Sequence, residues 1–579
     1  MFEITIDGVK TLVSENTTIL AAAKNIGIKI PSLCSLKLDE YFLNNHATCR
    51  MCVVEVDKRD GLYPACSTIC WEGMNVITNS SQIIQIRKNI LELLISNHPK
   101  DCLTCSKSGE CELQKLTQEF RIKEIRFDGE KNQFKSEYSE SIIREPEKCI
   151  MCRRCETMCN KVQTCGVLSA INKGFHSVVS TVYGNDLNKT VCTFCGQCVS
   201  VCPVGALHER NYIWEVIEAL ANPNKKVIAQ VAPAVRVSLG EEFNMEFGLN
   251  VEKKIVVALK KMGFDGVFDT TWAADLTIME EATELKERLD RYFSGDNTVK
   301  LPILTSCCPA WVNFIEYNFP NLLDIPSTSK SPQQMFSSVA KNIWAPMMNI
   351  KREDLVVVSI MPCLAKKYEA SRNEFIKDGS RDTDISISTR ELADMIKYFN
   401  IEFKEIEEVD FDNPMGEYTG AGIIFGRTGG VLEAALRTAH SWMIGEELDD
   451  VNILKLEKSK GLTIKKINFG SKELKIGVAH GLGNARKLLE DIQSGREQYH
   501  AIEIMACHCG CVGGGGQPFI HEKVEILEKR VEALNKIDVN SKLRKSHENP
   551  YVKKLYEDYF DFPCSEKAKA LLHTKFYKK

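Results

Sequence analysis

Cysteines placed directly after apolar, strand-like runs are the residues of this sequence with the most evident chemistry. The stretch AIEIMACHCGCVGGGGQP (501–518) reads as a buried strand that ends at Cys507, followed by Cys511 and by four glycines that allow close backbone approach. The run LPILTSCCPAW (301–311) contains a cysteine pair, and DLVVVSIMPCLAKK places Cys363 in the same position. Because ligands gather at the carboxyl ends of parallel strands, we predict a metal centre built by one parallel α/β sheet system.

A first additional set of cysteines lies near the N-terminus, at Cys34, Cys49, Cys52 and Cys66. An inner C-x2-C pair with two outlying cysteines is typical of a 2Fe-2S site. The alternative is a zinc site, which usually presents two tight pairs. The spacing therefore favours a 2Fe-2S cluster.

A second set combines one histidine with three cysteines: His98, Cys102, Cys105 and Cys111. A lone histidine is more often a surface or capping residue than an iron ligand. Here three cysteines leave a 4Fe-4S cluster one ligand short, and imidazole is an acceptable fourth ligand. We therefore expect a HisCys3 4Fe-4S site.

Two runs, CIMCRRCETMC and CTFCGQCVSVCP, share the pattern C-x2-C-x2-C-x3-C. In two-cluster ferredoxins the last cysteine of each run ligates the other cluster. The predicted ligands are Cys149, Cys152, Cys155 and Cys202 for cluster one, and Cys192, Cys195, Cys198 and Cys159 for cluster two. With the two sites before them, these clusters would form an electron wire.

The composition of the chain limits the classes of function. A net charge of -4 and 8% aromatic residues give no case for nucleic-acid binding, and no apolar run approaches the ~18 residues that span a bilayer. The N-terminal residues lack the features of a secretory signal, so we expect a cytoplasmic protein. In that compartment disulfides are disfavoured, so the clustered cysteines among the 24 are expected to bind metal rather than to form disulfides.

The elements that must position these ligands suggest four domains. Asp7-Gly8 between FEITI and VKTLV predicts a hairpin, and the helix-like TTILAAAKNIGI after it suits a β-grasp ferredoxin fold. From residue 210 strands alternate with helices, which favours a two-lobed α/β domain with parallel sheets. The expected strands are 226–233, 301–307, 355–361 and 501–506. The expected domains are a 2Fe-2S ferredoxin domain (1–80), a HisCys3 domain (81–125), a two-4Fe-4S ferredoxin domain (126–209) and a catalytic domain (210–579).

Two further stretches invite interpretation. The Gly-rich TGAGIIFGRTGGVLEAALR lacks the ending of a P-loop and the spacing of a dinucleotide fingerprint, so nucleotide binding is not expected there. The tail RKSHENPYVKKLYEDYFDFP is charged and aromatic, and we expect it to wrap as helix on the domain surface.

The segments TSCCPAW, MPCLAKKYE and MACHCGCVGGGGQP together resemble the three signature segments of the FeFe-hydrogenases, and the accessory sites follow in the order of the long monomeric type. The resemblance implies reversible 2H⁺ + 2e⁻ ⇌ H₂ at an H-cluster, a 4Fe-4S cube joined to a diiron site with CO, CN⁻ and an azadithiolate bridge. It also implies that Cys308, Cys363, Cys507 and Cys511 hold the cube, with Cys511 bridging to the diiron site. One 2Fe-2S and three accessory 4Fe-4S clusters complete the expected set.

The resemblance also implies residues around the diiron site. Lys366 would donate to a cyanide, and Glu369 would orient Lys366. The expected lining residues are Pro233, Ala234, Gln333, Met361, Met505 and Phe425.

A proton relay is implied as well. It would run through Cys307, Glu281, Ser327, Glu284 and Arg288, with Cys307 facing away from the cube because neighbours in a strand point to opposite sides. Helical spacing places the two glutamates and the arginine on one face, an arrangement that by itself favours a solvated surface. The expected partners are reduced ferredoxin or flavodoxin and dedicated diiron-site maturases, and we expect a monomer.

Three other functions compete with this one. The front half also resembles the electron-wire subunit of NADH:quinone oxidoreductases and formate dehydrogenases. A hydrogen sensor or an iron-sulfur assembly relative would share the fold, but the retained Cys307, Glu281, Glu284 and Lys366 favour turnover. Cys70, Cys165 and Cys564 have no evident role, and we hypothesise that Cys509 tunes the cluster or its response to oxidants.

Overall fold

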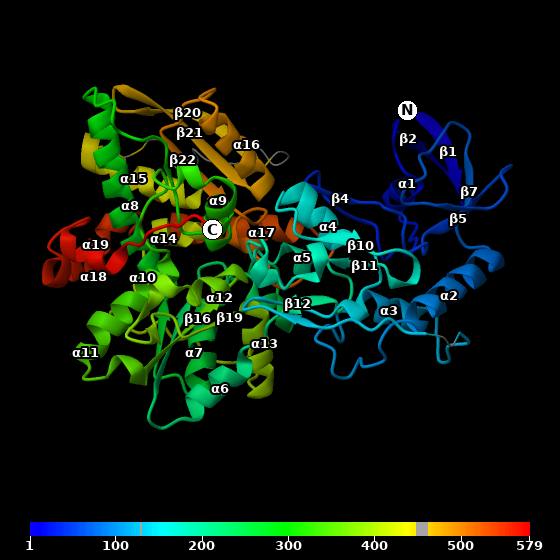
Figure 1. The fold of residues 1–579 in the computed structure, drawn as a ribbon, viewed down its shortest axis with the longest axis horizontal. Coiled ribbons are helices and arrows are strands. Elements are labelled where there is room, and N and C mark those ends of the chain that lie inside the picture. The colour runs from blue at the N-terminus through cyan, green and yellow to red at the C-terminus, as the bar shows by residue number, and fades with distance from the viewer. Residues whose placement is uncertain (128–129, 447, 449–460) are drawn as a thin grey trace. The chain divides into compact units, whose positions relative to one another are not determined.

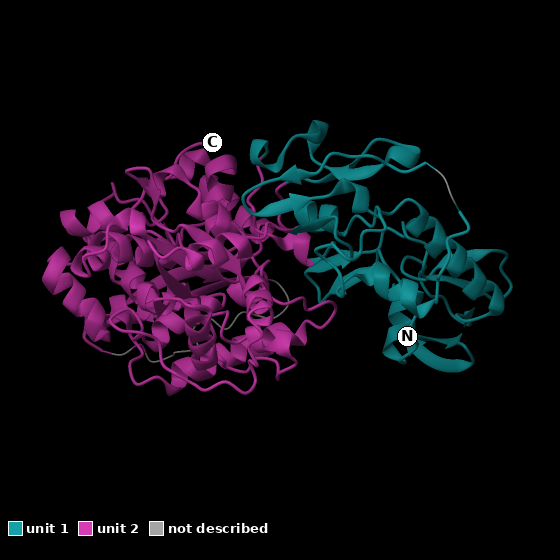
Figure 2. Cartoon of the chain, turned by 90° about the horizontal axis from the view of Figure 1, so that it is seen from below, with its two compact units in different colours: residues 1–161, 166–190, 201–208 teal, residues 162–165, 191–200, 209–579 magenta. Residues whose placement is uncertain are grey.

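The structure is a computed structural model that describes residues 1–127, 130–446, 448 and 461–579. The chain divides into two compact units (Figure 2). Unit 1 comprises residues 1–161, 166–190 and 201–208, and unit 2 comprises residues 162–165, 191–200 and 209–579. The division separates the second ferredoxin run, since Cys192, Cys195 and Cys198 belong to unit 2 and Cys202 belongs to unit 1. The four expected domain boundaries stay predictions.

Unit 1 begins with the predicted hairpin. Strands β1 (Phe2–Ile6) and β2 (Val9–Val13) flank Asp7 and Gly8, whose φ angles of 47° and 83° suit a type I′ turn. A mixed five-stranded sheet follows in the order β2-β1-β7-β5-β6, with β5 (Val53–Val56), β6 (Leu62–Pro64) and β7 (Asn75–Ile77). Helix α1 (Ile19–Asn25) is capped by Thr18 and packs its alanines into the core of this sheet, which gives the predicted β-grasp fold.

The rest of unit 1 consists of short elements around cysteine-bearing loops. These elements are β3 (Leu36–Leu38), β4 (Phe42–Asn44), α2 (Ser81–Ser96), α3 (Glu112–Glu119), β8 (Glu137–Tyr138), β9 (Ile142–Arg144), α4 (Arg154–Thr157), β10 (Ser169–Ile171), β11 (Val178–Ser180) and β12 (Leu207–Glu209). Strands this short bury little apolar surface, so bound clusters are a natural source of stability for these loops.

Unit 2 contains a parallel four-stranded sheet in the order β14-β13-β16-β19. Its strands are β13 (Lys226–Val231), β14 (Gly266–Asp269), β16 (Leu355–Met361) and β19 (Ile385–Ser388). The chain order reverses direction between β13 and β16, which makes the loops after these two strands a topological switch point. Both strands lie close to their predicted bounds.

A second sheet in unit 2 has the order β15-β22-β21-β20. Strands β15 (Ile303–Leu304), β22 (Ala501–Met505) and β21 (Lys472–His480) are parallel, and β20 (Leu462–Phe469) runs antiparallel to β21. The three cysteine-bearing strands therefore belong to two sheets, and the second sheet is mixed. β15 ends at Leu304, so the cysteine pair lies in the loop beyond it.

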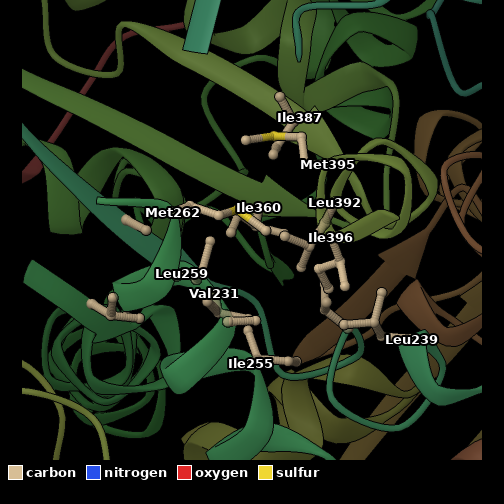
Figure 3. Packing of buried hydrophobic residues seen from close by; sticks show 14 of the residues in the cluster. Val231, Leu239, Ile255, Leu259, Met262, Ile360, Ile387, Leu392, Met395 and Ile396 are labelled. Atoms are coloured by element: carbon tan, nitrogen blue, oxygen red, sulfur yellow. The ribbon is translucent and has the colours of Figure 1, made fainter. Parts of the chain in front are cut away.

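Helices cover both sheets of unit 2. They are α5 (Gln197–Ser200), α6 (Ile213–Ala221), α7 (Glu252–Met262), α8 (Thr270–Phe293), α9 (Pro309–Asn318), α10 (Pro332–Val339), α11 (Ala345–Met347), α12 (Ala365–Ala370), α13 (Thr389–Tyr398), α14 (Gly420–Ile423), α15 (Gly430–Ile444), α16 (Leu482–Gln493), α17 (Glu525–Asn540), α18 (Pro550–Leu555) and α19 (Glu566–Leu572). Figure 1 shows α8 and α15 side by side. Figure 3 shows how side chains of α7 and α13 fill the core around Val231 of β13 and Ile360 of β16.

The Gly-rich stretch and the C-terminal tail are both largely helical. The stretch 419–437 forms α14, a 3-10 turn and the start of α15. The tail, residues 544–563, contains α18 and a π-helical turn, so it is helical as expected; Val552, Leu555 and Phe560 are nevertheless buried in a core cluster with α8 and α10, so it does not lie on the surface alone. Among the described helices, none combines the length and apolar character needed to span a membrane.

Candidate functional site

The loops after β13 and β16 form one side of the site. Val231 pairs with Ile360, and the Ala232 amide donates to the Ile360 carbonyl at 3.0 Å. This register sets Pro233 and Ala234, which follow β13, beside Cys363, which follows β16. The predicted lining residues and one predicted ligand therefore share the switch point of the first sheet.

The second sheet supplies the other side in the same way. Leu304 of β15 pairs with Ile502 of β22, and the Thr305 amide donates to the Ile502 carbonyl at 3.1 Å. Because the two strands are parallel neighbours, the loop with Cys307 and the loop with Cys507 leave the sheet at the same edge.

The four predicted cube ligands are close enough to affect one another's pKa values; they are Cys308, Cys363, Cys507 and Cys511. Burial raises the pKa of Cys363, and nearby Cys308 and Cys511 raise it further. Burial likewise raises the pKa of Cys511 to about 12. Without a metal, thiols with pKa values raised in this way stay protonated. The set of four sulfur donors fits an iron-sulfur cube, which would bind them as thiolates.

The four glycines after Cys511 allow backbone segments to meet. A Cβ on Gly514 would lie 2.1 Å from the Pro362 carbonyl oxygen, and a Cβ on Gly515 would lie 2.8 Å from the Gly196 backbone. The Gly516 amide donates to the Pro362 carbonyl at 2.9 Å. The glycine run therefore packs against the segment that carries Cys363 and against the ligand loop of the second ferredoxin run.

Lys366 lies in a chain of buried polar contacts. Its Nζ donates to Glu369 Oε2 at 2.8 Å and to the Cys307 carbonyl at 3.2 Å. Burial lowers the pKa of Lys366, but the Glu369 carboxylate outweighs burial and raises it, so the ammonium stays charged. Ser331 and Gln333 also donate to Glu369 Oε2, at 3.0 and 2.9 Å. Glu369 thus orients Lys366, and Gln333 acts on the site through Glu369.

The apolar lining residues occupy three different places. Met505 and Phe425 share one buried cluster with Cys307, whereas Met361 belongs to the core of the first sheet. Ala234 packs with Cys511 and accepts a hydrogen bond from Gln517 through its carbonyl at 3.1 Å. Gln517 and Ser331 were not expected from the sequence: Gln517 lies inside the third signature segment but was given no role, and Ser331 lies outside all three segments.

Cys307, Glu281 and Ser327 of the predicted relay are buried, whereas Glu284 and Arg288 are half-buried. Burial raises the pKa of Cys307, and Glu281 raises it further. Glu281 Oε1 accepts from the Ser306 amide at 3.3 Å, while Oε2 has no hydrogen-bond partner among the described residues. Burial raises the pKa of Glu281 to about 8. Arg288 donates to the Ile325 carbonyl at 2.8 Å. An unpaired oxygen of this kind suits a proton carrier rather than a solvated surface acid.

The middle of the relay differs from the predicted sequence of contacts. Ser327 Oγ accepts from the Ser329 amide at 3.2 Å, and Glu284 instead receives the hydroxyl of the next residue, Thr328, at 2.6 Å. His573 Nδ1 lies 2.7 Å from the Thr328 hydroxyl. Thr328 and His573 were missed because they are distant in sequence and carry no motif.

The accessory sites of unit 1 fit their clusters. The predicted 2Fe-2S ligands are all buried, and the Leu33 amide donates to Cys49 Sγ at 3.4 Å. His98 Nδ1 lies 2.9 Å from the Pro99 carbonyl, so it carries the proton, and the buried Nε2 has no partner among the described residues. A lone pair held in this way is what a metal-bound imidazole requires.

A cavity in unit 1 is lined by four cysteines, Cys149, Cys152, Cys155 and Cys202. These are the ligands predicted for cluster one, including the cysteine from the second run. In both runs the loop residues at equivalent positions, Met151 with Arg153 and Phe194 with Gly196, have positive φ. That conformation turns backbone amides toward sulfur, as the Met151 amide does toward Cys149 Sγ at 3.4 Å.

The ligand loop of the second run lies next to the cube site within unit 2. Cys195 is close enough to Cys507 to raise its pKa, after burial and the neighbouring cube cysteines. Gln197 donates to the Gly513 carbonyl at 3.0 Å, and Asn313 donates to the Cys192 carbonyl at 2.8 Å. These two segments are therefore in direct contact.

Family models match most of the chain. An iron only hydrogenase large subunit, C-terminal domain, matches residues 225–515, and an iron hydrogenase small subunit matches residues 524–579. A 2Fe-2S iron-sulfur cluster binding domain matches residues 1–81, an NADH-ubiquinone oxidoreductase-G iron-sulfur binding region matches residues 87–126, and a 4Fe-4S binding domain matches residues 186–208. The hydrogenase match overturns the alternative of an electron-wire subunit with an unrelated C-terminal domain.

Whole relatives agree with these models. The chain is 55% identical to the NADP-reducing hydrogenase subunit HndD of Solidesulfovibrio fructosivorans, over 100% of this chain and 99% of the relative. It is 38% identical to iron hydrogenase 1 of Clostridium pasteurianum over 100% of both chains. A solved FeFe-hydrogenase from Chlamydomonas reinhardtii covers 64% of this chain and 99% of its own, with a TM-score of 0.57 and 38% identity. A family model that matches half of the chain and two relatives that match all of it show that the chain belongs to the iron-only hydrogenases.

Proposed function

We propose that this chain catalyses reversible 2H⁺ + 2e⁻ ⇌ H₂ with an H-cluster held by Cys308, Cys363, Cys507 and Cys511. The observation that carries the proposal is the convergence of these four thiols, two of them buried and two half-buried, with the charged Lys366 and with Cys307. When bound, the H-cluster supplies the metal site at which protons and electrons combine.

The protein side chains handle protons and orientation in this proposal. Lys366, fixed by Glu369, supplies a positive charge and hydrogen-bond donors at a buried position. Cys307 lies close enough to Glu281 for the Glu281 charge to raise the pKa of the Cys307 thiol. Both side chains are neutral at pH 7, because burial disfavours their charged forms. A neutral carboxyl can accept and release a proton in one step, so Glu281 can connect Cys307 to Glu284.

The test is an anaerobic infrared spectrum of protein matured with the diiron cofactor, followed by H₂ assays of Cys307→Ala. We expect CO and CN⁻ stretches in both proteins and H₂ turnover in the wild type alone. Absence of the stretches from protein with full accessory clusters and verified maturation would contradict the proposal. Normal turnover by Cys307→Ala would contradict the relay.

We further propose four accessory clusters, one 2Fe-2S and three 4Fe-4S, which connect the site to an external electron carrier. Reduced ferredoxin or flavodoxin is one candidate carrier. The identity of 55% with an NADP-reducing hydrogenase subunit favours a second, a partner protein that reduces a nicotinamide nucleotide. The Gly-rich stretch of this chain forms helices, and Gly422 packs against Thr271, so that stretch offers no open phosphate loop.

The two carriers are distinguished by H₂-driven reduction assays. Reduction of ferredoxin by the isolated chain supports the first carrier. NADP⁺ reduction that requires co-purified partner proteins, without ferredoxin reduction, supports the second. The monomeric state, the cytoplasmic location and the need for maturases stay predictions from the sequence.

A further inference from the structure

A separate group of metal-type ligands lies beside the proposed relay, in residues that the reaction does not use. Glu280, Cys564 and His573 bring a carboxylate oxygen, a thiol sulfur and an imidazole nitrogen within 4.8 Å of one another. Glu280 is fully buried on α8, and Cys564 is 8% exposed in the turn before α19. His573 follows α19, so three separate elements of unit 2 build the group.

The hydrogen bonds define where the protons lie. The Thr328 hydroxyl donates to Glu284, so it must accept from His573 Nδ1 at 2.7 Å. His573 Nε2 lies 2.8 Å from Glu280 Oε2, which also accepts from the Cys564 amide at 2.8 Å. The ring is therefore hydrogen-bonded on both sides, and the contact between Nε2 and the carboxyl oxygen holds one proton between them.

The third ligand is a protonated thiol. Cys564 Sγ lies 3.7 Å from the Glu280 carbonyl oxygen, a weak contact at best. Burial and the Glu280 charge raise the pKa of Cys564. Cys564 also has a φ of 60°, which is uncommon for a residue other than glycine.

We propose that Glu280, Cys564 and His573 bind a divalent ion of the zinc class. Zinc accepts oxygen, nitrogen and sulfur ligands together in a tetrahedron, whereas magnesium and calcium prefer oxygen alone. Zinc bonds of roughly 2.0–2.3 Å place ligand atoms roughly 3.3–3.8 Å apart. To reach this spacing, the 2.8 Å contact between His573 and Glu280 has to open, and any wider pair, all of which lie within 4.8 Å, has to close.

Charge and protons balance in this binding step. The ion replaces the proton between His573 Nε2 and Glu280 Oε2 and the proton on Cys564 Sγ, and both protons leave the site. A charge of +2 enters while two positive charges depart, so the site keeps its net charge. Since each released proton contributes one power of ten per pH unit, affinity should rise about 100-fold per pH unit while both groups are protonated.

Occupancy has one consequence that rests on the proposed function. The metal-bound ring of His573 could no longer gain or lose a proton, and its Nδ1 lies 3.6 Å from Glu284 of the relay. Bound zinc should therefore slow H₂ turnover. The site itself is independent of this consequence, because binding is measured without turnover.

The test adds one equivalent of ZnCl₂ to anaerobic holoenzyme of verified iron content and records the zinc K-edge absorption spectrum, to which iron does not contribute. We expect one zinc-sulfur distance of about 2.3 Å with nitrogen and oxygen at about 2.0–2.1 Å. Affinity should rise about 100-fold between pH 6 and pH 7 by the two-proton balance.

Two ligand variants and one control variant complete the design. Cys564→Ser should remove the sulfur scattering and weaken zinc binding at least tenfold, while His573→Gln should weaken it similarly. Cys70→Ser removes a buried cysteine without a ligand role and should bind zinc as the wild type does. Unchanged sulfur scattering in Cys564→Ser, two or more sulfurs per zinc, or no binding would overturn the site. Binding without inhibition would overturn only the consequence for turnover.

Discussion

Replacement of Glu281 by glutamine should stop proton transfer while leaving the metal site intact. Glutamine has the same shape and can keep the acceptor for the Ser306 amide, but it cannot release a proton and take another. The side chain is 3% exposed, so the variant places no new group in solvent and opens no cavity. The substitution therefore tests the proton-transfer role of residue 281 without changing its packing.

The magnitude follows from the pKa of Glu281. Burial raises it from 4.5 to about 8, which corresponds to about 5 kcal/mol against the charged form. At pH 7 roughly nine in ten Glu281 side chains are neutral. A positioned acid-base group contributes roughly 10²- to 10⁴-fold to rate, so turnover of Glu281→Gln should fall by that range.

The assay is H₂ evolution with a reduced viologen dye, normalised to the infrared intensity of the bound CO ligands. Glu287→Gln is the matched control, because Glu287 lies on α8 but is exposed, and it should retain full rate. Turnover of Glu281→Gln within threefold of the wild type, at equal cofactor content, would refute the role of Glu281.

Three other variants and one pH series test the rest of the site. Cys202→Ser should remove one 4Fe-4S signal from the electron paramagnetic resonance spectrum and leave the 2Fe-2S signal, because Cys202 lines the cavity of cluster one; loss of neither signal would contradict the crossed ligation. His98→Ala should lower bound iron by up to four atoms per chain, and unchanged iron would remove His98 from the ligand set. Gly514→Ala should prevent formation of the cube, since its Cβ would lie 2.1 Å from the Pro362 carbonyl oxygen; a normal cube would show that the backbone can shift. Between pH 4.5 and 8 the unfolded chain loses the Glu281 proton that the folded chain keeps, so this residue lowers the free energy of unfolding as pH rises. At pH 7 the free energy of unfolding of Glu281→Gln should therefore exceed that of the wild type by up to about 3 kcal/mol. A lower value than that of the wild type would contradict burial as the cause of the raised pKa.

The cysteine spacings and the three signature segments predicted the accessory clusters and the family before any coordinates. Ligand spacing is a local property, because a short loop must place its sulfurs around one cluster, and the sequence records that loop directly. The strands at 226–231 and 355–361 were also predictable, since buried parallel strands appear as continuous apolar runs.

The tertiary structure decided which distant residues meet. No local pattern showed that β15 and β16 lie in different sheets, or that Thr328 and His573 adjoin Glu284. Glu281 illustrates the difference: its position on a helix favoured a solvated face, and only the packing of α8 makes it a buried acid with a pKa near 8. The sequence by itself was enough to predict the ligands, whereas burial, partners and charge state arise from contacts between segments and required the fold.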